Sequence, residues 1–258
     1  MPSMGPLLTL SALGQGCFEA AQVVIATGPF QQPRVPRVAE QLDSDVVQLH
    51  SSQYRRPDDV PDGPVLVVGG GNTGYQIAEE LAATREVHLS VGSRQTPLPQ
   101  RLLGRDLFRY LEGAGLMRLT VDSRVGQRMQ HRDVLIGSSP RAAGRRHGVR
   151  LHGRTVDVSA RTVRFADGTA LTPNAVIWAT GFALDHSFVD LPVFGEDGGL
   201  VHRRGVTRAP GLYFLGLPWQ HTRGSALLGW VKDDAEHIAT QIARYKPSAS
   251  PQRVVAGL

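Results

Sequence analysis

The stretch Val65-Leu66-Val67-Val68-Gly69-Gly70-Gly71-Asn72-Thr73-Gly74 decides the fold that we predict for this chain. It places an apolar run directly before a Gly-x-Gly-x-x-Gly pattern. From Thr73 to Thr84 the apolar residues then recur at helical spacing, on one side of the segment. A buried strand, a glycine turn and a helix in this order are typical of a dinucleotide-binding βαβ unit.

Each glycine of this pattern has its own physical task. Gly69 provides the tight turn, Gly71 leaves the backbone bare enough to approach a pyrophosphate, and Gly74 permits close packing of helix and strand. The helix that begins near Asn72 and Thr73 presents free backbone N–H groups and its positive dipole end to the phosphates. These five residues are therefore predicted to bind the cofactor, and the alternative is a glycine turn without a ligand.

The residues after the second predicted strand favour NADP over NAD. NAD sites place an acidic residue there, on the ribose hydroxyls, whereas this chain has Val91-Gly92-Ser93-Arg94. Without a carboxylate to repel a 2′-phosphate, Ser93 and Arg94 are available to bind one. The alternative is that Arg94 is an ordinary exposed arginine at the start of a loop.

The pattern around this unit predicts an α/β fold. Short β-branched runs predict buried strands at 22–26, 65–68, 87–91, 175–178 and 212–215, and helical spacing predicts helices at 73–84, 102–113 and 226–245. The last helix is expected to bury Leu228, Ile238 and Ile242. Alternating residues from 149 to 165, followed by Asp167-Gly168, predict an antiparallel hairpin, and residues 138–148 an exposed loop.

Composition excludes several classes of function. A single cysteine, Cys17, rules out an internal disulfide and any Cys-x-x-Cys redox or zinc motif. The formal net charge of +5 comes mainly from scattered arginines, with one cluster at 141–146, so nucleic acid is not expected as a partner. No apolar run of about eighteen residues and no secretory signal occur, so we expect a cytoplasmic protein without membrane attachment.

The sequence suggests no catalytic side chain of its own. No Ser-His-Asp arrangement and no His-Glu-x-x-His helix is evident, and Cys17 has no identifiable activating partner. The catalytic residues are therefore left unassigned, and no metal site is expected. This pattern fits chemistry that a bound cofactor performs while the protein orients the reactants and excludes water.

Four short elements occur in the order found in flavin-containing monooxygenases. They are Ile25-Ala26-Thr27-Gly28-Pro29-Phe30, the glycine loop, Ala179-Thr180-Gly181-Phe182, and Gly211-Leu212-Tyr213-Phe214-Leu215-Gly216. The chain resembles that family over nearly its whole length. The resemblance implies a Rossmann-like NADP-binding domain inserted in the remnant of an FAD-binding domain of the same general type. The chain would cross between the two at each Ala-Thr-Gly.

The resemblance also implies domain limits and cofactor contacts. Residues 1–62 would be the N-terminal remnant of the FAD domain and a linker, 63–171 the NADP-binding domain, and 172–258 the C-terminal part of the FAD domain. The two Ala-Thr-Gly elements place Thr27, Gly28, Thr180 and Gly181 near the cofactors. Gly216 corresponds to a glycine close to the flavin in related reductases, although Leu217-Pro218 here replaces the aspartate that usually follows it. A helix from about Ser225 would then point its amino end at the flavin.

A family fingerprint, Phe-x-Gly-x-x-x-His-x-x-x-Tyr or Trp, is half preserved between the first crossing and the glycine loop. His50 and Tyr54 match its second half, whereas Ser44 and Val46 replace its Phe and Gly. A terminal tyrosine is more like the members that oxidise heteroatoms than the Baeyer-Villiger members. His50 is a candidate cofactor contact, and the alternative is that His50 and Tyr54 only stabilise a linker.

The start of the chain departs most from the family. Members begin with a second Gly-x-Gly-x-x-Gly, for FAD, well upstream of the first Ala-Thr-Gly. Only 26 residues precede Thr27, and Gly14-Gln15-Gly16 lacks a strand before it and a βαβ unit after it. We therefore expect that the chain is truncated at its N-terminus.

The resemblance implies an oxidoreductase that uses NADPH and FAD. In such enzymes NADPH reduces FAD, and the reduced flavin takes up molecular oxygen to give a hydroperoxide that oxygenates a small soft nucleophile. Two alternatives stay open: a non-catalytic NADP-binding module or degenerate paralogue, and a flavin-dependent reductase without oxygen insertion. The sequence specifies neither the substrate nor the oligomeric state.

Overall fold

The computed structural model describes residues 7–12, 16–93, 95–130, 134–246 and 254–257. By their contacts the residues divide into two compact units. Unit 1 comprises Met1–Gln31, Leu111–His131 and Leu184–Leu258, and unit 2 comprises Gln32–Tyr110 and Arg132–Ala183. The glycine loop lies wholly in unit 2. The assignment of the predicted NADP and FAD domains to these segments remains a prediction.

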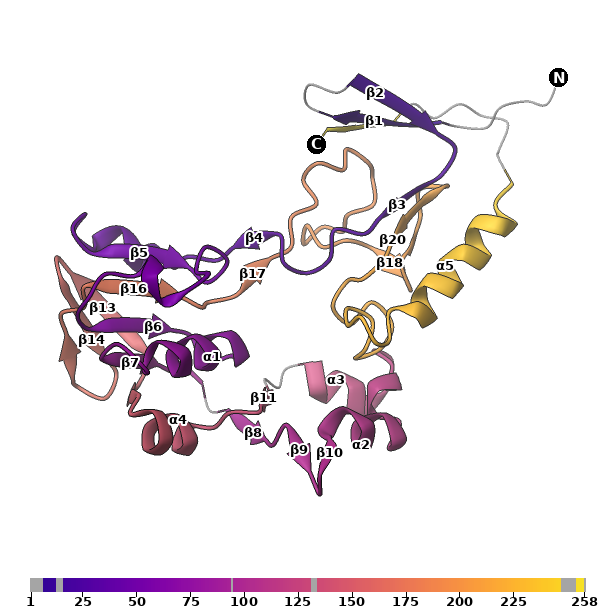
Figure 1. Cartoon of the computed structure of the whole chain (residues 1–258). Coiled ribbons are helices and arrows are strands. Elements are labelled where there is room, and N and C mark those ends of the chain that lie inside the picture. The colour runs from indigo at the N-terminus through magenta and orange to yellow at the C-terminus, as the bar shows by residue number, and fades with distance from the viewer. Residues whose placement is uncertain (1–6, 13–15, 94, 131–133, 247–253, 258) are drawn as a thin grey trace. The chain divides into compact units, whose positions relative to one another are not determined.

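Unit 2 is built on a five-stranded parallel sheet with the strand order β12-β7-β6-β16-β5 (Figure 1). Its strands are β5 (Val47–His50), β6 (Val65–Val68), β7 (Val87–Ser90), β12 (Arg150–His152) and β16 (Ala175–Trp178). The helix α1 (Asn72–Leu81) follows β6 directly. The predicted α/β class with a Rossmann-like unit is thereby confirmed.

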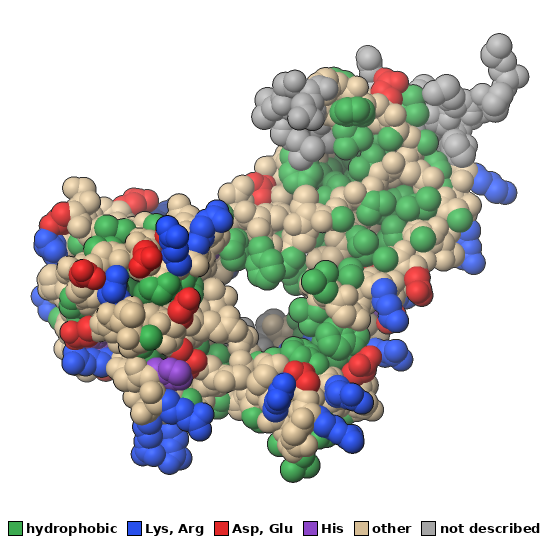
Figure 2. Space-filling view, in the orientation of Figure 1, with side chains coloured by type: hydrophobic (Ala, Val, Ile, Leu, Met, Phe, Trp, Pro, Cys, Tyr) green, Lys and Arg blue, Asp and Glu red, His purple; other side chains and the backbone are tan. Residues whose placement is uncertain are grey.

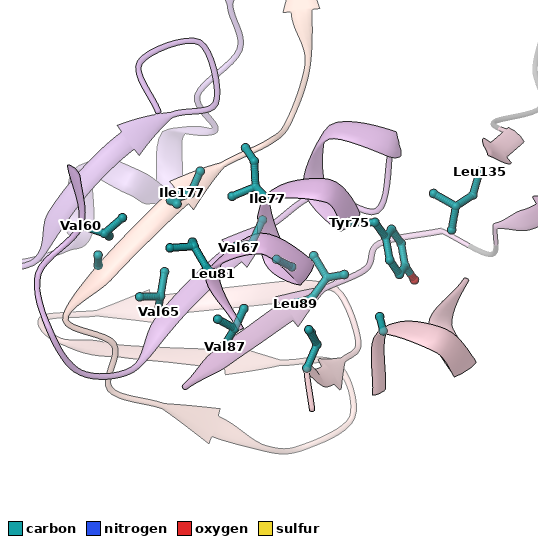
Figure 3. Close-up of a cluster of buried hydrophobic side chains, with 14 residues drawn as sticks. Val60, Val65, Val67, Tyr75, Ile77, Leu81, Val87, Leu89, Leu135 and Ile177 are labelled. Atoms are coloured by element: carbon teal, nitrogen blue, oxygen red, sulfur yellow. The ribbon is translucent and has the colours of Figure 1, made fainter. Parts of the chain in front are cut away.

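The sheet separates two hydrophobic cores because successive residues of β6 point to opposite faces. Val65 and Val67 pack with residues of α1, and Figure 3 shows them among Ile77 and Leu81. Leu66 and Val68 pack on the other face with side chains of a small antiparallel sheet, which consists of β13 (Thr155–Ser159), β14 (Thr162–Phe165) and β15 (Ala170–Leu171). Every residue of β6, β7 and β16 is buried, as expected for parallel strands covered on both faces.

The hairpin predicted around Asp167-Gly168 is confirmed. The strands β13 (Thr155–Ser159), β14 (Thr162–Phe165) and β15 (Ala170–Leu171) run antiparallel, and the turn between the last two contains Gly168 with a φ of +84°. The first part of the range 149–165, which was also predicted to be antiparallel, differs from this prediction. Its strand β12 instead joins the parallel sheet beside β7.

Residues 138–148, predicted to be an exposed loop, form a helix instead. The helix α4 (Pro140–His147) begins with a Ser139 cap that accepts a hydrogen bond from the Ala142 amide, and it ends at Gly148 in the left-handed conformation. These end signals outweigh the loop-like composition. The predicted basic cluster lies on this helix, and Figure 2 shows Lys and Arg side chains gathered in this part of unit 2.

The other two helices are shorter than predicted. In the range 102–113 only α2 (Leu107–Gly113) is helical, because Leu103 and Gly104 form a turn with positive φ between β9 (Arg101–Leu102) and β10 (Arg105–Asp106). The last helix, α5 (Lys232–Arg244), starts six residues after the predicted Ala226. Ile238 is buried as expected, but the expectation for Leu228 was wrong, since it is 97% exposed.

Unit 1 contains a four-stranded sheet with the order β18-β19-β20-β3 and a three-stranded sheet with the order β2-β1-β21. The strands are β1 (Leu8–Ala12), β2 (Gly16–Ala20), β3 (Val23–Ile25), β18 (His202–Arg203), β19 (Val206–Thr207), β20 (Leu212–Phe214) and β21 (Val254–Gly257). The expectation that no strand precedes Gly16 was wrong, because β1 and β2 form an antiparallel hairpin around it.

The remaining elements are short. Unit 2 also contains β4 (Gln32–Pro33), β8 (Thr96–Leu98), β11 (Val134–Ile136), β17 (Phe182–Ala183) and the 3-10 helices Arg37–Gln41 and Pro57–Asp59. Unit 1 also contains the 3-10 helix Leu116–Arg118 and α3 (Arg124–Gln130). Within the described ranges, no helix has the length and apolar character needed to cross a membrane.

Candidate dinucleotide site

The candidate site of unit 2 lies where the connections of the parallel sheet change direction. From β6 the chain continues to β7 and β12 on one side, whereas β16 and β5 lie on the other. The strands β6 and β16 pair in register, with Val68 opposite Trp178. The glycine loop and the second Ala-Thr-Gly element therefore leave the sheet side by side. Ligands of open parallel sheets bind at such a point, beyond the carboxyl ends of the strands.

A cavity of about 690 Å³ opens at this point. Six of the predicted cofactor contacts line it: Gly69, Gly71, Asn72, Ser93, Thr180 and Gly181. They come from three separate parts of the chain, and only the tertiary structure brings them together. Thr73 and Gly74 continue the first turn of α1 directly behind the glycine loop.

The three glycines of the fingerprint occupy three different environments. Gly69 has a φ of +130°, and a Cβ atom there would lie 2.2 Å from the carbonyl oxygen of Ala179. A Cβ atom on Gly74 would lie 1.9 Å from the carbonyl oxygen of Gly69. A Cβ atom on Gly71 would meet no described atom within 4 Å. Gly69 and Gly74 thus permit the turn and the close helix packing, and Gly71 keeps space open in front of the loop.

The start of α1 is free to receive an anion. Gly71 is its N-cap and offers no side chain, and its first turn contains no acidic residue. The side chain of Asn72 is engaged elsewhere, because its Oδ1 accepts from the Ile136 amide at 2.7 Å and its Nδ2 donates to the Val134 carbonyl at 3.2 Å. The backbone N–H groups of the first turn remain for a ligand, and helix N-termini favour anions.

The described residues that line the cavity carry positive charge only. Arg34 and Arg154 contribute guanidinium groups, and no aspartate or glutamate lines it. The Ser93 hydroxyl lies at the rim and accepts from Gln95 Nε2 at 3.3 Å. Arg94 lies outside the described residues. An anionic ligand is therefore favoured over a neutral or cationic one.

The second Ala-Thr-Gly element is fixed to the start of unit 2. The amide of Arg34 donates to the Gly181 carbonyl at 2.9 Å, and the Thr180 hydroxyl donates to the Arg34 carbonyl. Pro33 in β4 pairs with Phe182 in β17. Gly181 has a φ of +81°, a conformation that glycine adopts without strain. These contacts hold Arg34 and Thr180 at the same wall of the cavity.

The buried side chain of His50 stabilises the second Ala-Thr-Gly element. It is only 3% exposed, its Nε2 lies 3.0 Å from the Gly181 carbonyl oxygen, and its Nδ1 lies 2.9 Å from the Ser52 hydroxyl. Because a carbonyl oxygen only accepts, Nε2 carries the proton in this pair. The ring also meets Phe182 edge-on, with centroids 4.9 Å apart. Both ring nitrogens are thus engaged within the protein, and His50 positions Gly181.

Tyr54 stabilises the linker that precedes β6. Its hydroxyl donates to Glu80 Oε2 on α1 at 3.1 Å, and its ring packs against the core beneath α1. Burial, followed by the neighbouring Glu80 carboxylate, raises the pKa of Tyr54 above its usual value. Tyr54 therefore attaches the linker to α1.

The remaining predicted contacts belong to unit 1. Thr27 and Gly28 follow β3, and Gly216 follows β20, its parallel neighbour. Gln31 Nε2 donates to the Thr27 hydroxyl at 2.7 Å and to the Gly28 carbonyl at 2.9 Å. Because the carboxyl ends of parallel neighbours meet at one edge, these three residues share one edge of the unit 1 sheet.

The helix expected to point its amino end at a flavin starts later than predicted. Residues 226–231 form turns, and a Cβ atom on Gly224 would lie 2.6 Å from the Cβ of Trp230. The chain folds back at this contact before α5 begins at Lys232. The acidic residues Asp233 and Asp234 then occupy the first turn, where negative charge stabilises a helix.

Sequence reasoning missed the two charged residues among the described lining residues, Arg34 and Arg154. Neither belongs to a motif, and arginine is so frequent in this chain that its mere presence carries no information. Both reach the cavity through pairings between distant parts of the chain. Among the described residues, moreover, no three potential metal ligands come together, and Cys17 is exposed.

A parallel sheet, a glycine turn and an anion-favouring cavity are together typical of dinucleotide-binding oxidoreductases. Residues 13–101 match the family described as pyridine nucleotide-disulphide oxidoreductase. With a single cysteine, this chain cannot form the internal disulfide of that description.

Curated relatives identify the family more closely. The chain is 41% identical over 232 residues to a protein of Geobacillus kaustophilus named "uncharacterized oxidoreductase CzcO-like", covering 89% of this chain and 67% of the relative. It is 37% identical to CzcO of Bacillus subtilis, covering 87% and 66%. The chain therefore belongs to the flavin-containing monooxygenase-like family of oxidoreductases that includes CzcO, as the sequence resemblance indicated. It spans about two thirds of the length of these relatives.

Solved structures agree at the level of the fold. A mutant flavin monooxygenase from Stenotrophomonas maltophilia superposes with a TM-score of 0.67 at 24% identity, over 90% of this chain and 65% of that one. The closed form of cyclohexanone monooxygenase gives a TM-score of 0.59 at 16% identity, over 92% and 64%.

Proposed function

We propose that this chain belongs to an NADPH- and FAD-dependent oxidoreductase of the monooxygenase type and that the cavity of unit 2 binds NADPH. The observation that carries the proposal is the environment of Gly71. The space in front of its backbone is open, and α1 begins there without a side-chain cap. Among the described residues that line the cavity, arginine is the only charged type. A pyrophosphate needs this combination of access, N–H donors and positive charge.

Residues of both units take part in the proposed function. Gly69, Gly71 and the first-turn amides of α1 would hold the pyrophosphate. Ser93 and Arg94 would bind the phosphate on the adenosine ribose, and Thr180 and Gly181 would line the cavity beside the glycine loop. Thr27, Gly28 and Gly216 would contact FAD, since they share one edge of the unit 1 sheet. When both cofactors are bound, NADPH supplies the hydride that reduces the flavin, and the reduced flavin supplies the oxygen transfer from O₂ to a small soft nucleophile.

The protein's own contribution is positioning. His50 holds the Gly181 carbonyl, and Asn72 ties the start of α1 to β11, so the two loops that flank the cavity are fixed before a ligand arrives. Preformed loops reduce the entropy cost of binding. A cytoplasmic location, where NADPH is available, fits this proposal.

A second candidate, a non-catalytic NADP-binding module, rests on the described start of unit 1. Residues 8–12 and 16–20 pair as an antiparallel hairpin and residues 23–25 form a third strand, so the described residues from Gly16 to Ile25 contain no helix that could receive a second pyrophosphate. Uptake of FAD by this chain would therefore have to rely on the edge at Thr27, Gly28 and Gly216.

The visible absorption spectrum of the purified chain with added FAD, followed by NADPH titration, separates these proposals. A protein-bound flavin spectrum that NADPH bleaches supports the oxidoreductase, and oxygen consumption during turnover distinguishes a monooxygenase from a plain reductase. Saturable NADPH binding without flavin uptake would favour the binding module. Failure to bind NADPH would refute both.

A further inference from the structure

Arg154 lies at the end of the second strand of the Rossmann-like unit, although it is distant from that strand in sequence. The strands β7 and β12 are parallel neighbours that end together, with Ser90 opposite His152. Just beyond them, Nη2 of Arg154 donates to the Gly92 carbonyl at 3.1 Å. The guanidinium group therefore lies across Gly92, beside Ser93 at the rim of the cavity.

The backbone that carries Arg154 is held on both sides. Its carbonyl accepts from the Ala166 amide at 2.8 Å, and the amide of the next residue, Thr155, donates to the Ser90 hydroxyl at 3.0 Å. Ser90 is buried and also donates to the Gly153 carbonyl at 2.9 Å. The position from which the arginine reaches the cavity is thus fixed before any ligand binds.

Gly92 leaves the space that this guanidinium group occupies. Its backbone is outside the left-handed region, so the conformation does not require glycine. A Cβ atom on Gly92 would lie 3.4 Å from Nε of Arg154. A longer side chain, such as the carboxylate that NAD sites place near this point, would compete with the arginine for the same space.

The charge of Arg154 is available to a ligand. None of the ion pairs among the described residues involves it, and a guanidinium group has five N–H donors. In dinucleotide-binding βαβ units the residue after the second strand faces the 2′ position of the adenosine ribose. A fixed guanidinium group at that place suits a phosphate, which it can bind through two parallel N–H bonds.

We propose that Arg154 binds the 2′-phosphate of NADPH together with Ser93 and thereby sets the preference for NADPH over NADH. The inference rests on the proposed function of the cavity, and it adds a residue that no motif indicates. The competing interpretation is that Arg154 only fixes the Gly92 carbonyl and has no role in choosing the cofactor.

Titration of the whole chain with NADP⁺ and with NAD⁺ tests the inference without requiring catalysis, since the two ligands differ only in the 2′-phosphate. Arg154→Ala should weaken NADP⁺ binding about ten- to a hundredfold and leave NAD⁺ binding within about twofold, because a charge-assisted contact is lost for one ligand only. Arg154→Lys should restore part of the loss. Arg164→Ala is the matched control, since it removes an equal charge from an exposed residue of β14 that does not line the cavity.

The outcomes separate the inference from the proposal on which it rests. Equal weakening of both ligands, or no change in either, would refute the role of Arg154 while leaving the dinucleotide site in place. Wild-type protein that binds neither ligand would refute the proposed function and the inference with it. A melting temperature of Arg154→Ala close to that of Arg164→Ala would show that the affinity change does not come from unfolding.

Discussion

The change Gly74→Ala should destabilise unit 2 by overpacking the contact between α1 and the glycine loop. The new Cβ atom would lie 1.9 Å from the Gly69 carbonyl oxygen, a backbone atom that cannot rotate away. Relief requires α1 to move outward by about 1 Å, and overpacking of this kind costs about 1–3 kcal/mol. Replacing glycine by alanine in a helix returns up to about 1 kcal/mol. Because the clash is with a backbone atom, we expect a cost of overpacking in the upper part of that range, about 2–3 kcal/mol, and hence a net loss of about 1–2 kcal/mol.

Gly71→Ala separates this packing effect from ligand binding. Gly71 has a φ of −77°, which alanine adopts readily, and its added Cβ atom would meet no described atom within 4 Å. This variant should melt like the wild type but bind NADP⁺ poorly, because its methyl group occupies space that the pyrophosphate needs. Gly74→Ala should lower the melting temperature by about 3–6 °C for a chain of this size.

Thermal melting followed by circular dichroism, together with NADP⁺ titration, measures both effects. The reasoning would be refuted if Gly74→Ala melted with the wild type, since the close approach would then cost nothing. A drop in melting temperature for Gly71→Ala as large as that for Gly74→Ala would equally contradict the division of roles.

Three further predictions concern single contacts. Arg94→Ala should weaken NADPH binding by about 1.5–3 kcal/mol and NADH binding much less, and equal losses in titrations would exclude a phosphate contact. Asp234→Ala should destabilise unit 1 by about 1–3 kcal/mol in urea unfolding, because it removes the buried partner, 2.8 Å away, of the partly exposed Arg204. Burial lowers the pKa of both His88 and His152, and Nδ1 of the first lies 2.8 Å from Nε2 of the second. The unfolded chain therefore binds protons first, and stability should fall as the pH drops below about 6.5. The melting temperature of His152→Asn should depend less on pH over that range.

The sequence predicted the Rossmann-like unit because its signals are local. An apolar run, three glycines at fixed spacing and an amphipathic segment determine β6, the turn and α1 within one short stretch. The same holds for the hairpin at Gly168, where a turn residue and alternating neighbours act together. Such features depend on contacts between residues that are close in the chain, so the local sequence is sufficient to predict them.

Element ends were predicted less well where local signals conflicted. The segment 138–148 has the composition of a loop, yet Ser139 and Gly148 cap a helix there. The apolar spacing after Ala226 resembles a helix, yet the packing of Gly224 against Trp230 forces a turn and exposes Leu228. In the second case the deciding contact involves a backbone position that composition does not reveal.

The sequence by itself determined the Rossmann-like fold of unit 2 and the residues of its glycine loop, because turn, strand and helix there follow from neighbouring residues. Only the tertiary structure decided which distant residues complete the cavity. Arg154 reaches Gly92 because β12 pairs with β7, and His50 reaches Gly181 because β5 pairs with β16. Pairings between strands far apart in the chain leave no periodic pattern at the residues they bring together, so these two contacts could not be predicted from the sequence.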